Sequence, residues 1–242
     1  MQTTIIIPCY NEADRLNKDA FLQFLRNHEE VAFLFVNDGS KDNTLAMLEA
    51  FANEHENIHY LDVQPNGGKA EAVRRGMLHA VQHLNSDHLG FWDADLATPL
   101  YEIDNFLSQM QRRDFDMVTG LRLMRLGADV KRRPLRHYLG RCFATTASKV
   151  LKLPVYDTQC GAKLYKASIV PALFSEPFIS RWLFDVELLA RYRNAFGRDK
   201  AIRNIYEYPV LEWVDVGGSQ LKFKNYFYAP YELWKIKKRY SL

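Results

Sequence analysis

The sequence has few cysteines and no long hydrophobic run. Cys9, Cys142 and Cys160 are odd in number and scattered, and no CxxC pair occurs. This pattern argues against a disulfide framework and favours a reduced, cytosolic setting. No stretch reaches the roughly 18 apolar residues that a membrane-spanning helix needs, and the N-terminus, MQTTIIIPCYNE, lacks the basic flank of a signal peptide. We therefore expect a chain that does not itself cross a membrane.

Two common nucleotide-binding signatures are also missing. Neither GxGxxG nor GxxxxGK[ST] occurs in the sequence. Their absence argues against NAD binding of the usual kind and against P-loop ATP hydrolysis. The net charge of +3 is too small to indicate nucleic-acid binding by itself, and no recognised DNA- or RNA-binding motif is present. We therefore expect no nucleic-acid partner.

What is present is the composition and periodicity of an α/β protein. The 242 residues are 48% hydrophobic and 25% charged, which is typical of one large globular domain. Short apolar runs alternate with helical patterns, and this alternation predicts a mostly parallel sheet flanked by helices. The expected strands are 3–9, 31–37, 58–63, 88–92 and 116–120, and the expected helices are 43–54, 68–84 and 100–112. Beyond residue 120 we expect a basic, largely helical stretch at 121–150, a short strand or turn at 158–166, a helix at 183–195 and a strand at 203–213.

Polar motifs follow four of the predicted strands. CYNE, NDGS, PNGGK and DAD each come just after a strand, and ligands of parallel sheets bind at the carboxyl ends of the strands. Asp93 and Asp95 are compatible with a turn or with a divalent-cation site. Asp38 and Gly39 suit an Asp-Gly turn or contact with a base N–H group. PNGGK suits a plain loop or a phosphate at a helix N-terminus. Taken singly, each motif leaves both interpretations open.

The order and spacing of the motifs are more specific. The series IIIPCYNEADRL, FVNDGSKDNT, NGGKAEAVRRGM and DADLATP resembles the family 2 glycosyltransferases, which have the nucleotide-sugar-binding GT-A fold. The later segments YDTQCGAKLYK, RWLFDVELLAR and EWVDVGGSQLK resemble the dolichyl-phosphate β-glucosyltransferase branch of polyprenyl-phosphate glycosyltransferases. Dolichyl-phosphate mannose synthases are close relatives of that branch.

The resemblance implies roles for the donor-side residues. Asp95 would bind Mg²⁺ or Mn²⁺ directly, and Asp93 would face the ribose or the metal. Asp38, with Gly39, would bind the base, and Lys69 would lie near the diphosphate. The nucleoside would be surrounded by Pro8, Tyr10 and Glu12.

On the acceptor side, residues 122–141 contain seven Lys and Arg residues and a single acid, Asp129. This composition suits a solvated basic face or, under the resemblance, a lipid-phosphate site held by Arg122 and Arg136. Asp157 would orient the acceptor or the donor sugar, with base catalysis as the alternative, and Gln159 belongs to the same segment. Asp185 and Glu187 would contact the sugar, or else stabilise a helix N-terminus.

The C-terminal tail is both basic and aromatic. We expect a GT-A domain over 1–220, with a nucleotide-sugar-binding half at 1–120, an acceptor-binding half at 121–220, and a tail at 221–242. Aromatics and lysines suit a membrane-surface segment, although the aromatics would equally suit packing on the main domain. Pro230 is expected to break or start a helix. The interleaved residues are Lys222, Phe223, Lys224, Tyr226, Phe227, Tyr228, Tyr231, Trp234, Lys235, Lys237, Lys238 and Arg239.

The resemblance to the polyprenyl-phosphate glycosyltransferases implies an inverting hexosyltransferase. It would move glucose from UDP-glucose onto dolichyl or undecaprenyl phosphate, as a peripheral protein at the cytosolic membrane face. The alternatives are a mannose synthase that uses GDP-mannose, a transferase to a sugar hydroxyl in polysaccharide synthesis, and a nucleotide-sugar-binding protein without catalysis. The sequence contains no signal for the oligomeric state.

Overall fold

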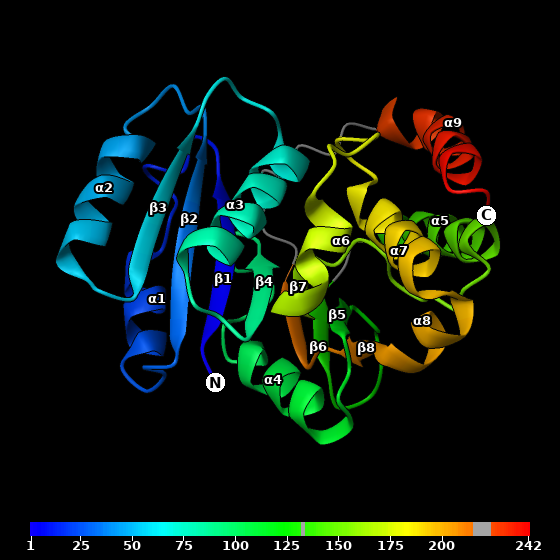
Figure 1. Cartoon of the computed structure of the whole chain (residues 1–242), viewed down its shortest axis with the longest axis horizontal. Coiled ribbons are helices and arrows are strands. Elements are labelled where there is room, and N and C mark those ends of the chain that lie inside the picture. The colour runs from blue at the N-terminus through cyan, green and yellow to red at the C-terminus, as the bar shows by residue number, and fades with distance from the viewer. Residues whose placement is uncertain (132–133, 215–223) are drawn as a thin grey trace.

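The computed structural model describes residues 1–131, 134–214 and 224–242, without the side chains of 134–136 and 224–227. Strands and helices alternate through the first half, as Figure 1 shows. The elements of this half are β1 (Thr3–Cys9), α1 (Lys18–Leu25), β2 (Val31–Asp38), α2 (Thr44–Glu54), β3 (Ile58–Val63), α3 (Lys69–His83), β4 (His88–Trp92), α4 (Glu102–Arg113) and β5 (Met117–Leu121). The second half contains β6 (Asp129–Lys131), α5 (Pro134–Leu151), β7 (Ala162–Lys166), α6 (Val170–Phe174), α7 (Phe184–Phe196), α8 (Arg198–Asn204), β8 (Ile205–Pro209), β9 (Glu212–Val214) and α9 (Lys224–Arg239).

One seven-stranded sheet organises the molecule, in the order β3-β2-β1-β4-β7-β5-β8. The pairs among β1 to β4 and the β5–β8 pair are parallel, whereas β7 runs antiparallel to both β4 and β5. Strands β6 and β9 form a separate parallel pair. The expectation of a mostly parallel sheet flanked by helices is therefore confirmed.

Helices cover both faces of the sheet, because its central strands are apolar on both sides. Along β1, Ile5 and Ile7 face one hydrophobic cluster and Ile6 faces the other, as the two-residue period of a strand requires. Helices α3, α6 and α7 cover the Ile6 side, and α1, α2 and α4 cover the opposite side. This arrangement leaves the loops at the carboxyl edge of the sheet free to form a site.

The predicted elements agree with the structure most closely in the first half. The five predicted strands and three predicted helices there occur with their ends shifted by two residues or fewer. Helices α1, α6 and α8 were not predicted, nor was strand β6, which lies in the stretch 121–150 that was expected to be largely helical. The strand predicted over 203–213 is wrong at its start, because residues 203–204 end α8, and two short strands, β8 and β9, follow. No local sequence pattern predicts that β7 is antiparallel, because its direction depends on pairing with β4 and β5, which are distant in the chain.

The C-terminal helix α9 corrects the prediction for Pro230, which lies inside the helix rather than at a break or a start. A proline within a helix removes one backbone hydrogen bond. The apolar side of α9 offsets that loss, because Leu233 and Ile236 are buried in the core shared with α5 and α7. The predicted boundary between 220 and 221 lies outside the described residues. In the described part of the chain, none of the helices has the length and apolar character needed to span a bilayer.

Candidate functional site

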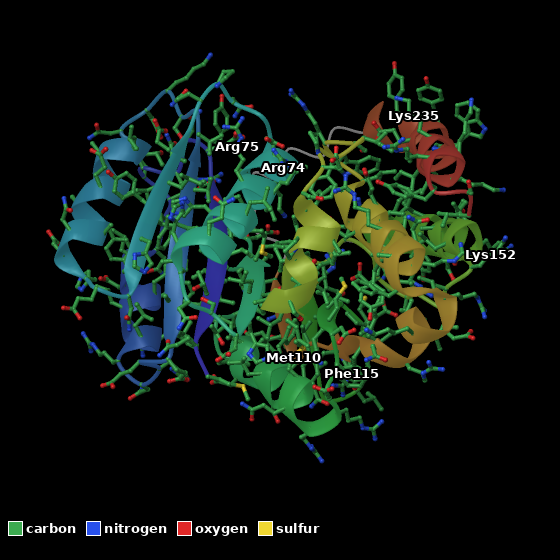
Figure 2. All side chains as sticks on the ribbon, viewed as in Figure 1. Arg74, Arg75, Met110, Phe115, Lys152 and Lys235 are labelled. Carbon is green, nitrogen blue, oxygen red and sulfur yellow. The ribbon has the colours of Figure 1, made fainter. Side chains whose placement is uncertain are left out.

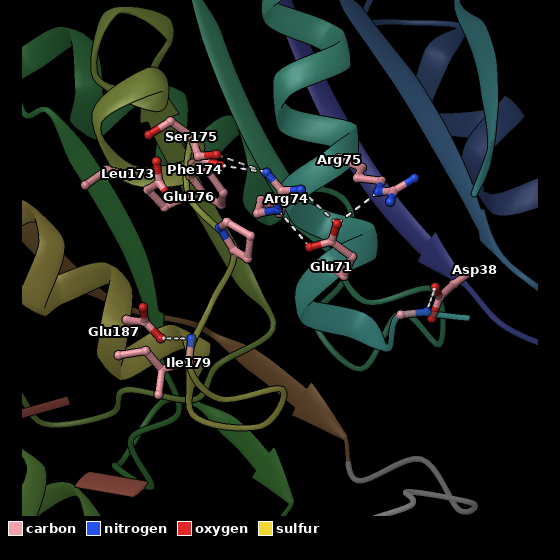
Figure 3. Close-up of polar contacts among 12 residues, drawn as sticks. Asp38, Glu71, Arg74, Arg75, Leu173, Phe174, Ser175, Glu176, Ile179 and Glu187 are labelled. Atoms are coloured by element: carbon pink, nitrogen blue, oxygen red, sulfur yellow. Dashed lines mark hydrogen bonds and ion pairs between the residues drawn. The ribbon is translucent and has the colours of Figure 1, made fainter. Parts of the chain in front are cut away.

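The loops after β2 and β3 meet at the carboxyl edge of the sheet. Asp38 is buried at the end of β2, and its two carboxylate oxygens accept hydrogen bonds from the backbone amides of Gly67 and Gly68, both at 2.8 Å. Figure 3 labels Asp38 and draws a contact of its carboxylate with a backbone amide. Asn66 donates to the carbonyl of Asp38 at 2.7 Å. Gly39 has a φ of +61°, and a Cβ there would lie 2.7 Å from the backbone nitrogen of Asn66. Glycine at 39 is therefore required by the approach of a neighbouring loop.

Lys69 and Asp93 bring the third and fourth motifs together. Lys69 begins α3 and forms an ion pair with Asp93, which follows β4. Burial alone would lower the pKa of the Lys69 ammonium, but the charges of Asp93 and Asp185 outweigh it, and the pKa is raised. Lys69 therefore stays charged at the positive end of a helix, where anions bind favourably.

Asp95 lies with the residues of the first motif. Glu12 accepts from Arg15 at 2.6 and 3.1 Å, and its backbone amide donates to the hydroxyl of Thr44 at 2.8 Å. The charges of Glu12 and Asp95 both raise the pKa of Arg15, although its side-chain hydrogen bond with Glu12 contributes more. The loop after β1 therefore adjoins the DAD motif, and it adds a cation, Arg15, that the sequence analysis did not single out.

The donor atoms of Asp93 and Asp95 fit a hard divalent cation. Desolvation and the nearby charge of Asp93 raise the pKa of the Asp95 carboxyl, and a bound cation would relieve both effects. No cluster of three or more His, Cys, Asp or Glu side chains suited to a metal occurs among the described residues. Mg²⁺ commonly takes one or two carboxylates and completes its shell with substrate phosphates and water. The pair therefore suits a cation that binds together with a diphosphate.

A second ion pair lies beneath this edge of the sheet. Lys163 of β7 donates to Asp185 of α7 and to the carbonyl of Cys160, both at 2.6 Å, and both charged side chains are buried. Burial raises the pKa of Asp185, although Lys163 and Lys69 oppose that effect. The Nζ atoms of Lys69 and Lys163 lie 5.9 and 5.2 Å from the centre of the Phe91 ring. Asp185 thus supports Lys69 electrostatically from inside the fold.

Arg122 and Asp157 form a central ion pair of the predicted acceptor-binding half. The Nε and Nη2 atoms of Arg122 donate to the two oxygens of Asp157 at 2.7 and 2.8 Å, and the backbone amide of Arg122 adds a bond of 3.1 Å. Gln159 donates its backbone amide to Asp157 at 3.2 Å. Burial would lower the pKa of Arg122, but the charge of Asp157 and its side-chain hydrogen bonds together outweigh burial, and the pKa is raised. Arg122 also lies 5.2 Å from the centre of the Trp213 ring.

Two observations connect this pair with the acidic motif. The charge of Asp93 contributes to the raised pKa of Arg122. The carboxylate of Asp93 also packs against Gly161, where a Cβ would lie 1.9 Å from Oδ2. Gly161 follows the segment of Asp157 in the chain. The acidic pair and the Arg122–Asp157 pair therefore belong to one region.

Other predicted site residues lie as follows. Pro8 is within β1, and Tyr10 follows that strand, both partly exposed. Glu187 lies elsewhere: it is fully buried and accepts from Arg191, Tyr240 and the backbone amide of Ile179. This carboxylate holds α9 and the 179 loop to α7, so we do not retain it as a sugar contact. Arg136 lies in α5, but its side chain is outside the described residues.

Four residues of this region were not identified from the sequence as part of a site: Arg15, Gly161, Lys163 and Glu207. The first two had a usable signal, because they stand inside the quoted motifs IIIPCYNEADRL and YDTQCGAKLYK. Lys163 also stands in the second motif, but its burial in the core is a tertiary fact. Glu207 lies in β8, outside the quoted motifs, and only its contacts distinguish it: its carboxylate accepts hydrogen bonds from the backbone amides of Tyr156 and Asp157.

The comparisons with known proteins agree with this architecture. A model described as Glycosyl transferase family 2 matches residues 4–174. The chain is 32% identical to the dolichyl-phosphate beta-glucosyltransferase ALG5C of Trichomonas vaginalis, over 97% of this chain and 70% of that protein. It is 26% identical to the human dolichyl-phosphate beta-glucosyltransferase, over 99% and 76%.

Solved structures show the same fold. Glucosyl-3-phosphoglycerate synthase from Mycobacterium tuberculosis, in complex with UDP, aligns with a TM-score of 0.68 at 15% identity, over 100% of this chain and 80% of that one. The same enzyme in complex with Mn²⁺, UDP and glucosyl-3-phosphoglycerate aligns with a TM-score of 0.68 at 15% identity, over 99% and 79%.

Proposed function

This chain belongs to glycosyltransferase family 2, and we propose that it transfers glucose from UDP-glucose, with inversion, onto a polyprenyl phosphate such as dolichyl or undecaprenyl phosphate. The observation that carries the proposal is the arginine–carboxylate pair Arg122–Asp157 beside the acidic pair Asp93 and Asp95. The names of the similar proteins support both the sugar and the acceptor. The UDP in the aligned enzyme supports the nucleotide.

On the donor side, the residues act by binding and by charge. Asp93 and Asp95 would hold Mg²⁺ or Mn²⁺, which stabilises the charge that develops on the leaving diphosphate. Lys69 exchanges Asp93 for a phosphate oxygen, because its side chain is 39% exposed and, among the described residues, Asp93 is the one carboxylate that pairs with it. Asp38 keeps the loop of Gly67 and Gly68 in place and, in this proposal, also faces the base.

On the acceptor side, we propose that Arg122 binds the lipid phosphate, together with Arg136. The guanidinium of Arg122 uses Nε and Nη2 for Asp157, and a planar guanidinium has five N–H donors in all. Because Asp157 accepts three bonds from Arg122 and one from Gln159, we assign it to positioning rather than to base catalysis. A phosphate acceptor is already anionic near neutral pH, so it needs alignment and charge neutralisation rather than a base.

We further propose that the outer side of α9 rests on the cytosolic face of the membrane that contains the acceptor. Tyr228, Tyr231 and Trp234 are 65%, 55% and 53% exposed, while Leu233 and Ile236 on the inner side are buried. The Nζ atom of Lys235, which Figure 2 labels on α9, lies 4.4 Å from the centre of the Tyr231 ring. Lys238 lies 5.3 Å from the ring of Trp234. Exposed aromatics beside lysines suit lipid headgroups.

The decisive test is a donor–acceptor matrix. Purified protein with Mg²⁺ or Mn²⁺ is incubated with radiolabelled UDP-glucose or GDP-mannose, with and without polyprenyl phosphate. We expect label from UDP-glucose to enter the lipid phase, and Arg122→Lys to abolish most of that transfer while leaving UDP binding intact. Arg198→Lys, at an exposed arginine of α8, is the matched control.

The other outcomes of the matrix are also informative. Transfer from GDP-mannose alone would replace the sugar and keep the acceptor. Transfer only to a sugar hydroxyl, unaffected by Arg122→Lys, would overturn the acceptor assignment. UDP binding without turnover of any donor would indicate a nucleotide-sugar-binding protein.

The membrane contact has a separate test. The double variant Tyr231→Ser, Trp234→Ser should sediment less with vesicles that contain anionic lipid. Tyr60→Ser removes an exposed aromatic from β3, at the opposite end of the sheet, and should leave sedimentation unchanged. Equal sedimentation of the double variant and the wild type would reject the α9 surface.

A further inference from the structure

Glu207 holds the turn that carries Asp157. It lies in β8, opposite Thr119 of β5, and it is partly buried. Its Oε1 accepts from the backbone amides of Tyr156 and Asp157 at 2.9 and 2.7 Å, and its Oε2 accepts from Tyr156 at 2.7 Å. One carboxylate therefore fixes two successive peptide groups, which a loop of this kind would otherwise leave to solvent.

The same turn is fixed from the other side by α5. Arg141 donates to the carbonyl of Tyr156 at 2.6 Å, and its guanidinium carbon lies 3.2 Å from the centre of the Tyr156 ring. The side chain of Asp157 then receives Arg122. The turn is thus held between an acid and a base that come from different elements, and the position of Arg122 depends on it.

We propose that Glu207 is a positioning residue for the acceptor phosphate: by binding the amides of Tyr156 and Asp157, it fixes Asp157, and through Asp157 it orients the guanidinium of Arg122. This inference rests on the proposed function, because it assumes that Arg122 binds the acceptor. It assigns a role to a residue that touches neither donor nor acceptor. A positioning role differs from general support of the fold, because loss of the Glu207 carboxylate should weaken acceptor binding selectively.

The ionisation of Glu207 adds a specific signature. Burial raises its pKa to about 7, against the ordinary value of 4.5. The amides of Asp157 and Tyr156 oppose this rise, the charge of Asp157 adds to it, and Arg141 opposes it. Thr119, the partner on β5, carries no charge. The anionic form accepts three N–H contacts, whereas protonation makes one oxygen a donor that faces N–H groups. Positioning should therefore weaken as the pH falls through 7.

Kinetics of the full chain with Glu207→Gln test the inference. We expect the KM for polyprenyl phosphate to rise about tenfold, as for the loss of a charged hydrogen bond, while the KM for the nucleotide sugar stays within twofold. We also expect the rise in acceptor KM between pH 8 and pH 6 to be smaller in the variant than in the wild type, because the acceptor phosphate titrates in both proteins whereas Glu207 titrates only in the wild type. Glu102→Gln is the matched control, because Glu102 is also buried and accepts a backbone amide at 2.6 Å, that of Leu211.

Two further measurements separate this inference from the proposed function. Binding of a soluble short-chain isoprenyl phosphate, followed by calorimetry, needs no turnover and should weaken about tenfold in the variant. The pH dependence of unfolding needs no ligand at all. Since the pKa of Glu207 is raised on folding, the free energy of unfolding should fall between pH 4.5 and about 7 in the wild type, and this fall should be smaller in Glu207→Gln.

The possible results are unambiguous. Equal acceptor affinity in wild type and variant, or the same pH dependence of unfolding in both, would overturn the role of Glu207 even if lipid product forms. If the wild type showed neither lipid transfer nor isoprenyl-phosphate binding, the proposed function would instead be overturned. The inference would fall with it, because Arg122 would then have no phosphate to receive.

Discussion

The two halves predicted for this protein, a donor half at 1–120 and an acceptor half at 121–220, differ in how deeply they bury their ion pairs. In the donor half, the ion pair of Lys69 and Asp93 leaves the two side chains 39% and 35% exposed. In the acceptor half, the pair of Lys163 and Asp185 is 1% and 8% exposed. An exposed pair exchanges its partner for a ligand at small cost, whereas a buried pair cannot lose one member without leaving a charge unpaired. The Lys69–Asp93 pair is therefore available to ligands, whereas the Lys163–Asp185 pair fixes geometry.

The comparison predicts opposite results for two lysine substitutions. Lys163→Met should lower the free energy of unfolding by about 3–5 kcal/mol, because Asp185 remains buried without its partner. Lys69→Met should change stability by less than about 1 kcal/mol, yet weaken UDP binding. Urea unfolding and UDP titration of both variants measure the difference. Similar stability losses in the two would show that the halves do not differ in this way.

Removing the carboxylate of Asp95, a proposed metal ligand, should affect activity strongly and stability little. Asp95→Asn keeps the shape of the side chain but loses the charge that a divalent cation requires, and we expect the rate to fall about a hundredfold. The fold should tolerate the change, because burial and the charge of Asp93 raise the pKa of Asp95 and so disfavour its anion. The measurement is Mn²⁺-dependent transfer, together with Mn²⁺ titration in the presence of UDP. Asp199→Asn, at an exposed carboxylate of α8, provides the control.

The sequence predicted the structure of the donor half more completely than that of the acceptor half. In the donor half, each motif stands at the carboxyl end of a parallel strand, so topology alone predicts that Asp38, Lys69 and Asp93 converge. The periodicity of β1 likewise predicts a strand covered on both faces. Helix α1, with only eight residues, is too short for its pattern to be distinguished from that of a loop.

In the acceptor half, the contacts join residues far apart in the chain. Arg122 and Asp157 are 35 positions apart, and Glu207 is 50 positions from Asp157. Neither hydrophobic periodicity nor turn-forming residues predict such long-range contacts. These contacts depend on the antiparallel insertion of β7 between β4 and β5. The prediction for Pro230 is wrong for a related reason: local propensity predicts that a helix breaks or starts there, and the burial of Leu233 and Ile236 overrides that propensity.

Gly161 joins the two halves, and a methyl group there should disturb both. A Cβ at position 161 would lie 1.9 Å from Oδ2 of Asp93, so Gly161→Ala must displace the carboxylate. We expect about a tenfold loss of Mn²⁺-dependent transfer, with the fold retained, as is typical of a misplaced ligand of this kind. A double-mutant cycle with Asp93→Ala checks the cause. If Asp93 transmits the effect, Gly161→Ala should cost nothing more once Asp93 is absent; additive losses would point to a different origin.

Substitution of the α9 lysines should have the smallest effect of these changes. The lysines act through their charge, and their ammonium groups remain in contact with water. Lys235 and Lys238 lie over the rings of Tyr231 and Trp234, so they approach a bilayer together with the aromatics. Each lysine near an anionic surface contributes about 1 kcal/mol, so Lys235→Ala should lower vesicle partitioning about fivefold at low salt. The difference should shrink as ionic strength rises, since screening shortens the reach of the charge.

Lys152→Ala is the matched control, because Lys152 is exposed beyond α5 rather than on α9. A loss that persists at high salt would mean that Lys235 acts through Tyr231 packing, and the membrane contact would then depend on the aromatics alone.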